Sequence, residues 1–407
     1  MSSKLIKMKD RILRNINRIV PKLERSMYVS LMPSTLSSKV DILNNSASNL
    51  CHLIYEYCQI NHQKMTTIFF EYSDPDRLHE YRRFAMRVRV NNINLRFILT
   101  DNAYKGWRRR YTRMINILKQ FSTLIWLCET GDCCFLGKLK CQQIVCFNYF
   151  ISCKSDLVVG ENYRWGGVDG LVTTSLLHGQ IISSATGVKL DKCVPIGFPR
   201  NDTLFYNNKK KVVYHWIASK IGYLPKHIIV FAPTARDYDN KKKKIKLLLG
   251  YEMYGFDRYL QDNEIAFIYK LHYYHSEYNL VPMKGVIQFE ESYDFTLYDI
   301  LAFADCVITD YSSIGYDFII TGKPTIYNLY DYDKYVKDRG LSYEPYEYFC
   351  PGEIVTTSSE MYKALNNVLN KTDKYEGKRS QICRILHKYN DNKATERAVD
   401  YLESLLN

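Results

Sequence analysis

The sequence contains no run of 18 or more apolar residues, and its N-terminus lacks the apolar core and small-residue cleavage site of a signal peptide. We therefore expect a cytoplasmic protein. None of the twelve cysteines forms a C-x-x-C pair, and the six between Cys128 and Cys153 lack the spacing of zinc ligands. We therefore expect reduced, mostly buried thiols and no metal site.

The chain is rich in positive charge and long enough for two domains. Its formal net charge of +13 favours anionic partners, which include nucleic acid, anionic lipid and phosphate-rich substrates. No RNP-type aromatic pair, zinc finger or helix-turn-helix spacing accompanies the basic residues, so we expect no nucleic-acid partner. At 407 residues and 46% hydrophobic, the chain exceeds the usual size of a single domain.

Residues 1–26 have the pattern of a basic amphipathic helix. Eight Lys or Arg and two acidic residues lie between positions 4 and 25, and apolar residues recur there at steps of three or four. Such a helix can lie in the headgroup layer of an anionic leaflet, or it can pack on the protein's own core. The first interpretation predicts a peripheral protein on the inner face of the cell membrane.

Short apolar runs separated by helix-like segments predict an α/β fold with two doubly wound, Rossmann-like domains facing a cleft. A turn-rich stretch at residues 194–202 places the hinge near residue 203. The predicted parts are an N-terminal domain, a C-terminal domain and a helical segment that packs back across both: 27–202, 203–377 and 378–407. The predicted strands cover residues 27–31, 67–70, 95–100, 122–127, 143–147, 170–174, 227–232, 265–271, 285–289, 305–309 and 324–328.

Polar residues follow the predicted strand 305–309 at the point where a helix should begin. Asp310 comes first, and the hydroxyls of Ser312 and Ser313 could meet one anion together with the free N–H groups and dipole of the helix. Simple N-capping by Ser312 is the alternative. The turn Thr321-Gly-Lys-Pro324 extends the pattern, so we predict a phosphate site.

Two other strands of the same domain end in polar residues that would lie on the same rim. Thr234 and Arg236 follow strand 227–232, where Arg236 could either donate two hydrogen bonds to a phosphate or form a surface salt bridge. His272 follows the next strand and could bond a pyrophosphate or protonate a leaving group. An isolated histidine is more often a packed or solvated residue, but its shared rim favours a function.

In their order, these motifs resemble those of the CDP-glycerol glycerophosphotransferase family of teichoic acid and capsule synthesis. The resemblance implies a GT-B-type fold, with CDP-glycerol bound by the C-terminal domain and the acceptor presented by the N-terminal domain. Thr234, Arg236, His272, Ser312 and Ser313 match the family's donor contacts. The matching motifs are Gly197-Phe-Pro-Arg-Asn-Asp202, Ala232-Pro-Thr-Ala-Arg236, Lys270-Leu-His272, Thr309-Asp-Tyr-Ser-Ser313, Asp317-Phe318, Thr321-Gly-Lys-Pro324, Arg339-Gly-Leu and Pro351-Gly352.

The resemblance implies that the terminal hydroxyl of a lipid-linked or polymer acceptor attacks the β-phosphorus of CDP-glycerol and releases CMP. CDP-glycerol is then a substrate and no cofactor is implied, while a need for a divalent cation stays open. Because the donor motifs recognise mainly pyrophosphate, ribitol or another polyol fits equally well. The alternatives are a GT-B nucleotide-sugar glycosyltransferase and a non-catalytic relative that binds the donor.

The N-terminal half departs from the family at the general base. The family carries Trp-His-Gly followed closely by Lys, but this chain has no histidine between His79 and His178. Matching Lys154 to the family's lysine places Tyr149 where the catalytic histidine would be. Tyrosine, with an ordinary pKa of about 10, is a poor base at neutral pH unless a cation such as Lys154 lowers that pKa. His178 is the remaining alternative.

Overall fold

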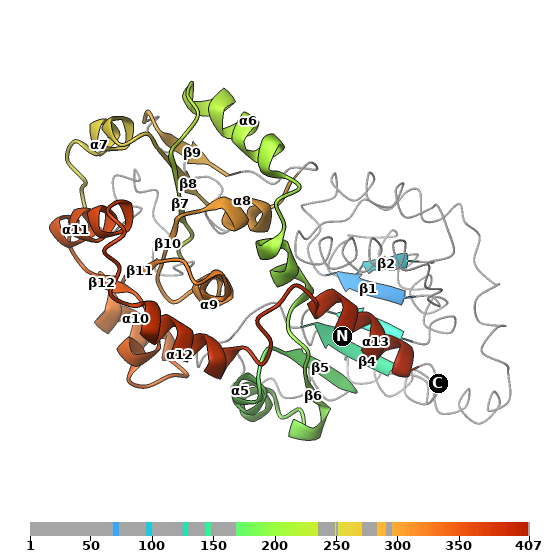
Figure 1. Ribbon diagram of the computed structural model, residues 1–407. Coiled ribbons are helices and arrows are strands. Elements are labelled where there is room, and N and C mark those ends of the chain that lie inside the picture. Colours follow the sequence, from blue (N-terminus) through green and yellow to red (C-terminus); the bar gives the residue numbers. More distant parts are fainter. Residues whose placement is uncertain are drawn as a thin grey trace, which may run out of the picture. The chain divides into compact units, whose positions relative to one another are not determined.

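The computed structural model describes residues 168–234, 249, 251–270, 283–289 and 295–405, together with four earlier strands. These strands are β1 (Ile68–Tyr72), β2 (Leu95–Leu99), β3 (Ile125–Cys128) and β4 (Gln143–Phe147). The chain divides into two compact units (Figure 1). In the described residues, unit 1 contains β1 to residue 200 and residues 393–405, and unit 2 contains residues 201–392.

Unit 1 is built on a parallel sheet of six strands in the order β2-β1-β3-β4-β5-β6, completed by β5 (Gly170–Thr173) and β6 (Cys193–Pro195). Helix α5 (Leu176–Thr186) and the short η6 (Leu190–Lys192) connect the last two strands. Helix α5 begins at Ser175, whose hydroxyl accepts the N–H of His178, and ends at a left-handed Gly187. Helix α13 (Ala394–Ser404) returns to this unit.

Unit 2 contains a second parallel sheet of six strands, in the order β12-β11-β10-β7-β8-β9. From β7 the chain adds β8 and β9 on one side, then returns to place β10, β11 and β12 on the other. Numbered from β7, this is the order 3-2-1-4-5-6 of nucleotide-binding α/β folds. The strands are β7 (His227–Phe231), β8 (Ile265–Tyr269), β9 (Val286–Gln288), β10 (Cys306–Thr309), β11 (Thr325–Asn328) and β12 (Glu353–Val355).

Helices cover both faces of this second sheet because alternate strand residues face opposite sides. In β7, Ile228 and Val230 pack in a core with α6 (Lys210–Ile221), α8 (Leu297–Phe303) and α9 (Ile314–Phe318). Ile229 and Phe231 pack in the other core with α7 (Phe256–Asp262) and α11 (Ser358–Leu369). Figure 1 shows these two helix groups on opposite sides of the strands. The remaining elements of unit 2 are η7 (Pro199–Phe205), which begins in unit 1, η10 (Ile319–Thr321), α10 (Tyr332–Arg339), η11 (Tyr346–Phe349) and α12 (Glu376–Leu386).

The structure confirms the predicted α/β fold with parallel sheets, and each predicted strand from 67–70 onward corresponds to a described one within a few residues. The predicted strand 27–31 lies outside the described residues. The sequence did not predict the three-residue strands β6 and β12. Of the predicted segment 378–407, α12 lies in unit 2 and α13 lies in unit 1. The units separate between Arg200 and Asn201, a few residues before the hinge predicted near residue 203. The N-terminal segment 1–26 lies outside the described residues.

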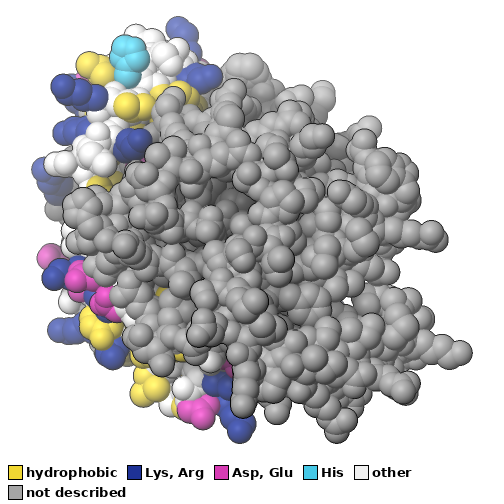
Figure 2. Space-filling model, turned by 90° about the vertical axis from the view of Figure 1, so that its right-hand side faces the viewer, with side chains coloured by type: hydrophobic (Ala, Val, Ile, Leu, Met, Phe, Trp, Pro, Cys, Tyr) yellow, Lys and Arg dark blue, Asp and Glu magenta, His cyan; other side chains and the backbone are white. Residues whose placement is uncertain are grey.

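Among the described residues, no helix has the length and hydrophobicity needed to span a membrane. The structure describes the side chains of five of the twelve cysteines, all of them free thiols, and four of these are buried, as expected. Burial raises the pKa of the Cys383 thiol to about 11. On the face drawn in Figure 2, the described side chains include Lys and Arg beside hydrophobic ones.

Candidate anion site at the second sheet

The candidate site lies where the strand order of the second sheet reverses. Strands β7 and β10 are hydrogen-bonded neighbours there, with Ile308 opposite Phe231. The chain leaves β7 and β10 in opposite directions, and α/β sheets with this strand order bind ligands outside the carboxyl ends of such strands. Thr234 follows β7 and Asp310 to Ser313 follow β10, so the structure brings these predicted residues to one place.

Asp310 links the two strand ends. Its side chain is 2% exposed, and its Oδ1 accepts hydrogen bonds from the backbone N–H of Thr234 at 2.8 Å and of Tyr311 at 2.6 Å. Its carbonyl oxygen accepts the hydroxyl of Tyr346 at 2.8 Å. Asp310 thus holds the ends of β7 and β10 together, and its predicted contact with a pyrophosphate stays a prediction.

Close packing fixes the start of α9 against the end of β10. The hydroxyl of Thr309 donates to the carbonyl of Ala232 at 2.9 Å. A Cβ atom at Gly315 would lie 2.8 Å from Cγ2 of Thr309, so only glycine permits this approach. Tyr311 stacks on Tyr335 with ring centroids 3.7 Å apart, which holds the chain just before the serines.

Ser312 and Ser313 present the polar groups of the site. Both are half-buried, and among the residues that the structure describes neither hydroxyl has a hydrogen-bond partner. The backbone N–H groups of Ser312, Ser313 and Ile314 likewise donate no hydrogen bond to a described residue. Consecutive N–H groups with adjacent hydroxyls can bind an anion such as a phosphate. This arrangement can therefore bind a phosphate oxygen with several donors at once.

The helix that follows differs from the one predicted. Ser313, not Ser312, is the N-cap residue, and its side chain makes no capping hydrogen bond. Helix α9 has only five residues before it tightens into η10. Its dipole is correspondingly small, so the hydroxyls and N–H groups supply most of the attraction for an anion.

A positive charge lies at the end of the neighbouring strand β8. Lys270 follows Tyr269 directly, and its backbone N–H donates to the carbonyl of Phe231 at 2.9 Å. Its ammonium group lies 5.5 Å from the centroid of the Phe289 ring. This contact orients a lysine on the rim that carries Thr234 and Ser313.

Residues 159–404, which include this site, match the model of the CDP-glycerol:poly(glycerophosphate) glycerophosphotransferase family. The match covers more than half of the chain. The chain belongs to this family. The family that the ordered sequence motifs resemble is thereby confirmed.

Individual relatives of the glycerophosphotransferase family match different lengths of the chain. The teichoic acid poly(ribitol-phosphate) polymerase of Bacillus spizizenii is 30% identical over 53% of the chain, but the matched part is only 34% of that polymerase. The teichoic acid glycerol-phosphate primase of Bacillus subtilis is 26% identical, over 77% of the chain and 75% of the primase. The chain thus spans about a third of the first relative's length.

Among solved structures, the wall teichoic acid polymerase TagF has the same fold as this chain. One TagF structure aligns with a TM-score of 0.68 at 21% identity, covering 98% of this chain and 96% of the TagF chain. At 21% identity, this similarity shows a shared fold and nothing more. It agrees with the two parallel sheets described above.

Three predicted site residues of this family member lie outside the described residues. They are Arg236, His272 and Tyr149, and Lys154 lies outside them as well. Thr234 and Lys270 are the last described residues before Arg236 and His272, respectively. They follow the carboxyl ends of the adjacent strands β7 and β8. The roles of the three residues therefore stay predictions.

The turn Thr321-Gly-Lys-Pro324 was predicted to extend the phosphate site, and here the structure corrects the prediction. The ammonium group of Lys323 donates to the carbonyl oxygens of Ala302 at 2.9 Å and Ala304 at 2.8 Å. Lysine thus caps the C-terminal end of α8. Burial lowers the pKa of Lys323 from its ordinary value.

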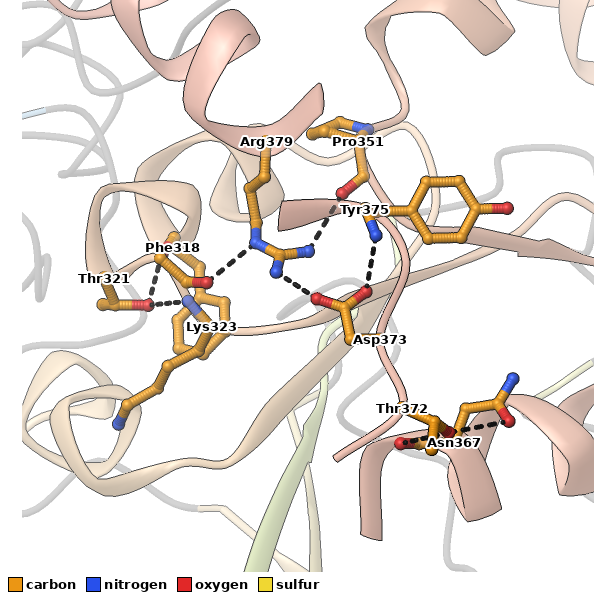
Figure 3. Close-up of polar contacts among 10 residues, drawn as sticks. Phe318, Thr321, Lys323, Pro351, Asn367, Thr372, Asp373, Tyr375 and Arg379 are labelled. Atoms are coloured by element: carbon orange, nitrogen blue, oxygen red, sulfur yellow. Dashed lines mark hydrogen bonds and ion pairs between the residues drawn. The ribbon is translucent and has the colours of Figure 1, made fainter. Parts of the chain in front are cut away.

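A buried arginine holds the same turn from the other side, as Figure 3 shows. Arg379 is 2% exposed, and its guanidinium donates to the carbonyl oxygens of Gly322 at 2.9 Å and Pro351 at 3.3 Å and forms an ion pair with Asp373. The family motifs around Gly322 and Pro351 are therefore joined by one side chain. Their role here is structural.

His178, the alternative general base, is fully buried in unit 1. Its Nδ1 accepts the backbone N–H of Thr174 at 3.1 Å, which places the proton of the neutral ring on Nε2. A nitrogen that already carries a proton and lies away from solvent cannot accept one from a substrate hydroxyl. The structure therefore argues against His178 as the base.

Two tyrosines in the site region have roles that the sequence did not indicate. Tyr346 bonds the backbone of Asp310, and Tyr298 bonds the carboxylate of Asp317 in α9 at 2.6 Å. Each lies 19 or more residues from its partner along the chain. Because the chain contains 35 tyrosines, no local pattern distinguishes these two.

Proposed function

We propose that this chain transfers glycerol phosphate, or a related polyol phosphate, from CDP-glycerol to the terminal hydroxyl of a lipid-linked or polymer acceptor, with release of CMP. The observation that carries this proposal is the set of donors at Ser312, Ser313 and Ile314, placed at the switch point of a nucleotide-binding sheet. Membership of the CDP-glycerol:poly(glycerophosphate) glycerophosphotransferase family supports CDP-glycerol as the substrate that donates the polyol phosphate. Relatives include polymerases of both ribitol phosphate and glycerol phosphate, so the polyol stays open.

The proposed reaction exchanges one phosphorus–oxygen bond for another. The acceptor hydroxyl gives its proton to the general base, for which Tyr149 is the candidate, and its oxygen bonds the β-phosphorus. The bond from that phosphorus to the bridging oxygen breaks, and CMP leaves with the electron pair. Hydrogen-bond donors on the phosphate oxygens stabilise the charge that the transferring group carries. The proposed hydrogen-bond donors to these phosphate oxygens are Ser312, Ser313, Thr234, Arg236 and His272.

The proposed function implies a GT-B-type arrangement, in which two Rossmann-like domains face a cleft. Two parallel sheets of six strands, each in a compact unit of its own, support this arrangement. The acceptor would then be presented by unit 1.

The decisive experiment incubates the full chain with radiolabelled CDP-glycerol and a lipid-linked glycerol-phosphate acceptor, with Mg²⁺ or with EDTA. We expect CMP release together with label in the polymer, and CDP-ribitol run in parallel identifies the polyol. Saturable donor binding without CMP would instead support the non-catalytic relative, which the missing histidine favours. Transfer from a nucleotide sugar would support the glycosyltransferase.

The general base can be tested in the same assay. We expect Tyr149→Phe to slow turnover by roughly 10² to 10⁴ while leaving the affinity for CDP-glycerol unchanged, because a base acts on the acceptor hydroxyl. Tyr348→Phe, at an exposed tyrosine of η11, is the matched control. Unaltered turnover in Tyr149→Phe would remove Tyr149 from the mechanism.

We also infer that an anionic membrane surface on the cytoplasmic side is a partner. Residues 203–226 contain five lysines and no acidic residue, and they include four large exposed apolar side chains: Phe205, Tyr206, Val212 and Leu224. Lysines beside exposed aromatic side chains suit a headgroup layer, to which each lysine contributes about 1 kcal/mol. The segment 1–26 is a second candidate contact.

Sedimentation with vesicles distinguishes these two contacts. We expect deletion of residues 2–24, and separately the replacement of Lys209, Lys210 and Lys211 by Gln, each to lower binding to vesicles containing phosphatidylglycerol by at least tenfold. The control replaces Lys337, Lys363 and Lys374 by Gln, which removes the same charge from scattered exposed positions. Equal losses in control and test would show a response to net charge alone.

A further inference from the structure

Within the described residues, the chain passes between the two units twice. It enters unit 2 between Arg200 and Asn201, inside η7, and returns to unit 1 between Asn392 and Lys393. We call residues 194–202 the first crossing and residues 387–397 the second crossing. Each crossing is hydrogen-bonded to the same short helix, α9.

The first crossing is attached to α9 by a buried carboxylate. Asn201 is 4% exposed, and its Nδ2 donates to Oδ1 of Asp317 at 3.2 Å. Asp317 has no exposed surface, and its other oxygen accepts the hydroxyl of Tyr298 at 2.6 Å. A buried carboxylate with both oxygens bonded has little freedom to move, so the first residue of unit 2 follows α9 closely.

The second crossing is attached to the neighbouring residue of α9. His387 is buried and directly follows the last residue of α12. It lies five residues before the last residue of unit 2. Its Nε2 lies 2.8 Å from the carbonyl oxygen of Tyr316. Because a carbonyl only accepts hydrogen bonds, this nitrogen carries the proton.

In unit 1 the two crossings are also bonded to each other. Nε of Arg397 donates to the carbonyl oxygen of Ile196 at 2.8 Å. A Cβ atom at Gly197 would lie 3.3 Å from the Cβ of Ala394, which shows how closely the two segments pack. The crossings therefore cannot shift independently of one another at their unit 1 ends.

The other end of α9 carries the proposed phosphate site. The carbonyl oxygen of Ser313 accepts the N–H groups of both Tyr316, at 3.0 Å, and Asp317, at 3.1 Å. Ser313, the serine proposed to bind phosphate, is therefore linked through one helical turn to Tyr316 and Asp317, the two residues that are bonded to the crossings. Close packing of Gly315 on Thr309 leaves this turn little room to deform.

We propose that α9 couples donor binding at Ser312 and Ser313 to the two chain crossings, with Asn201, Asp317 and His387 as positioning residues. This inference rests on the proposed donor site. Coupling between two sites is reciprocal, so a donor that orders α9 also orders the crossings, and loosening a crossing weakens donor binding. Such couplings commonly change affinity by about 5- to 150-fold.

The first test is a double-mutant cycle on the full chain, with the affinity for CDP-glycerol measured by calorimetry. We expect Asn201→Ala to weaken binding by roughly 5- to 50-fold, but by less than about threefold when Ser313 is already alanine. The matched control is Asn367→Ala, which removes a bond of the same kind in the same unit, from Nδ2 to Glu353 at 3.1 Å. We expect the control to leave donor affinity unchanged.

A swap of the two polar groups separates positioning from general stability. Asn201→Asp alone places two carboxylates together and should weaken donor binding further, whereas adding Asp317→Asn restores an amide–carboxylate bond and should recover most of the affinity. Hydrogen exchange adds a structural readout. We expect CDP-glycerol to slow exchange at residues 194–202 in the wild type and not in Asn201→Ala.

The outcomes are distinguishable. An Asn201→Ala effect no larger than the control's, an effect that is additive with Ser313→Ala, or failure of the swap to recover affinity would each overturn the coupling while leaving the donor site intact. A wild-type protein that binds no CDP-glycerol would overturn the proposed function and this inference with it.

Discussion

Replacing Ser312 and Ser313 together by alanine is expected to weaken binding of CDP-glycerol by roughly 10² to 10⁴. Each hydroxyl that donates to an ionised phosphate is worth about 1.5–3 kcal/mol, and every 1.4 kcal/mol is a factor of ten in affinity. Since among the described residues neither hydroxyl bonds another group, their removal leaves no protein atom without its partner. We therefore expect the melting temperature to stay within a few degrees of the wild type.

Calorimetric titration with CDP-glycerol, CMP and cytidine measures this effect and locates it. The loss should be large for CDP-glycerol and absent for cytidine, which has no phosphate to contact the serines. Ser359→Ala, at an exposed position of α11, is the control. Equal losses for cytidine and CDP-glycerol would mean that the serines support the fold of the site rather than bind phosphate.

Asp310→Ala is expected to destabilise unit 2 by about 2–6 kcal/mol. The change leaves the buried N–H groups of Thr234 and Tyr311 without an acceptor, and each such loss costs about 1–3 kcal/mol. For a domain of this size, that lowers the melting temperature by roughly 5–20 °C. Donor binding should fall as well, because the ends of β7 and β10 are no longer joined.

Asp310→Asn provides the comparison that assigns the role of this residue. An amide oxygen can still accept both N–H groups, so we expect less than half the destabilisation, and donor affinity at least as high as in the wild type because a negative charge has been removed near the phosphates. Thermal melts and donor titrations of both variants decide. A variant Asp310→Asn that loses turnover while it keeps its stability would instead place the carboxylate in the chemistry.

Several elements of the candidate anion site could be predicted from sequence because their signals are local. Strands β7 and β10 are short runs of apolar residues, and the polar residues that follow them are contiguous, so Thr234 and Ser312 could be assigned to the rim of a parallel sheet. Lys323 was harder, since a lysine in a turn can bond either a phosphate or a helix end. Its acceptors are the carbonyl groups of Ala302 and Ala304, some twenty residues away.

The sequence by itself determined the α/β class, the two sheets and the residues that follow their strands, because apolar runs and turn-forming residues act over a few neighbouring positions. Only the tertiary structure decided which polar side chains remain available for a ligand. Asp310 and Lys323 have partners in the protein, whereas Ser312 and Ser313 have none among the described residues. It also decided that both crossings meet at α9, since Asn201 and Asp317 are 116 residues apart along the chain. Hydrogen bonds over such separations depend on how sheets and helices pack, which no local pattern encodes.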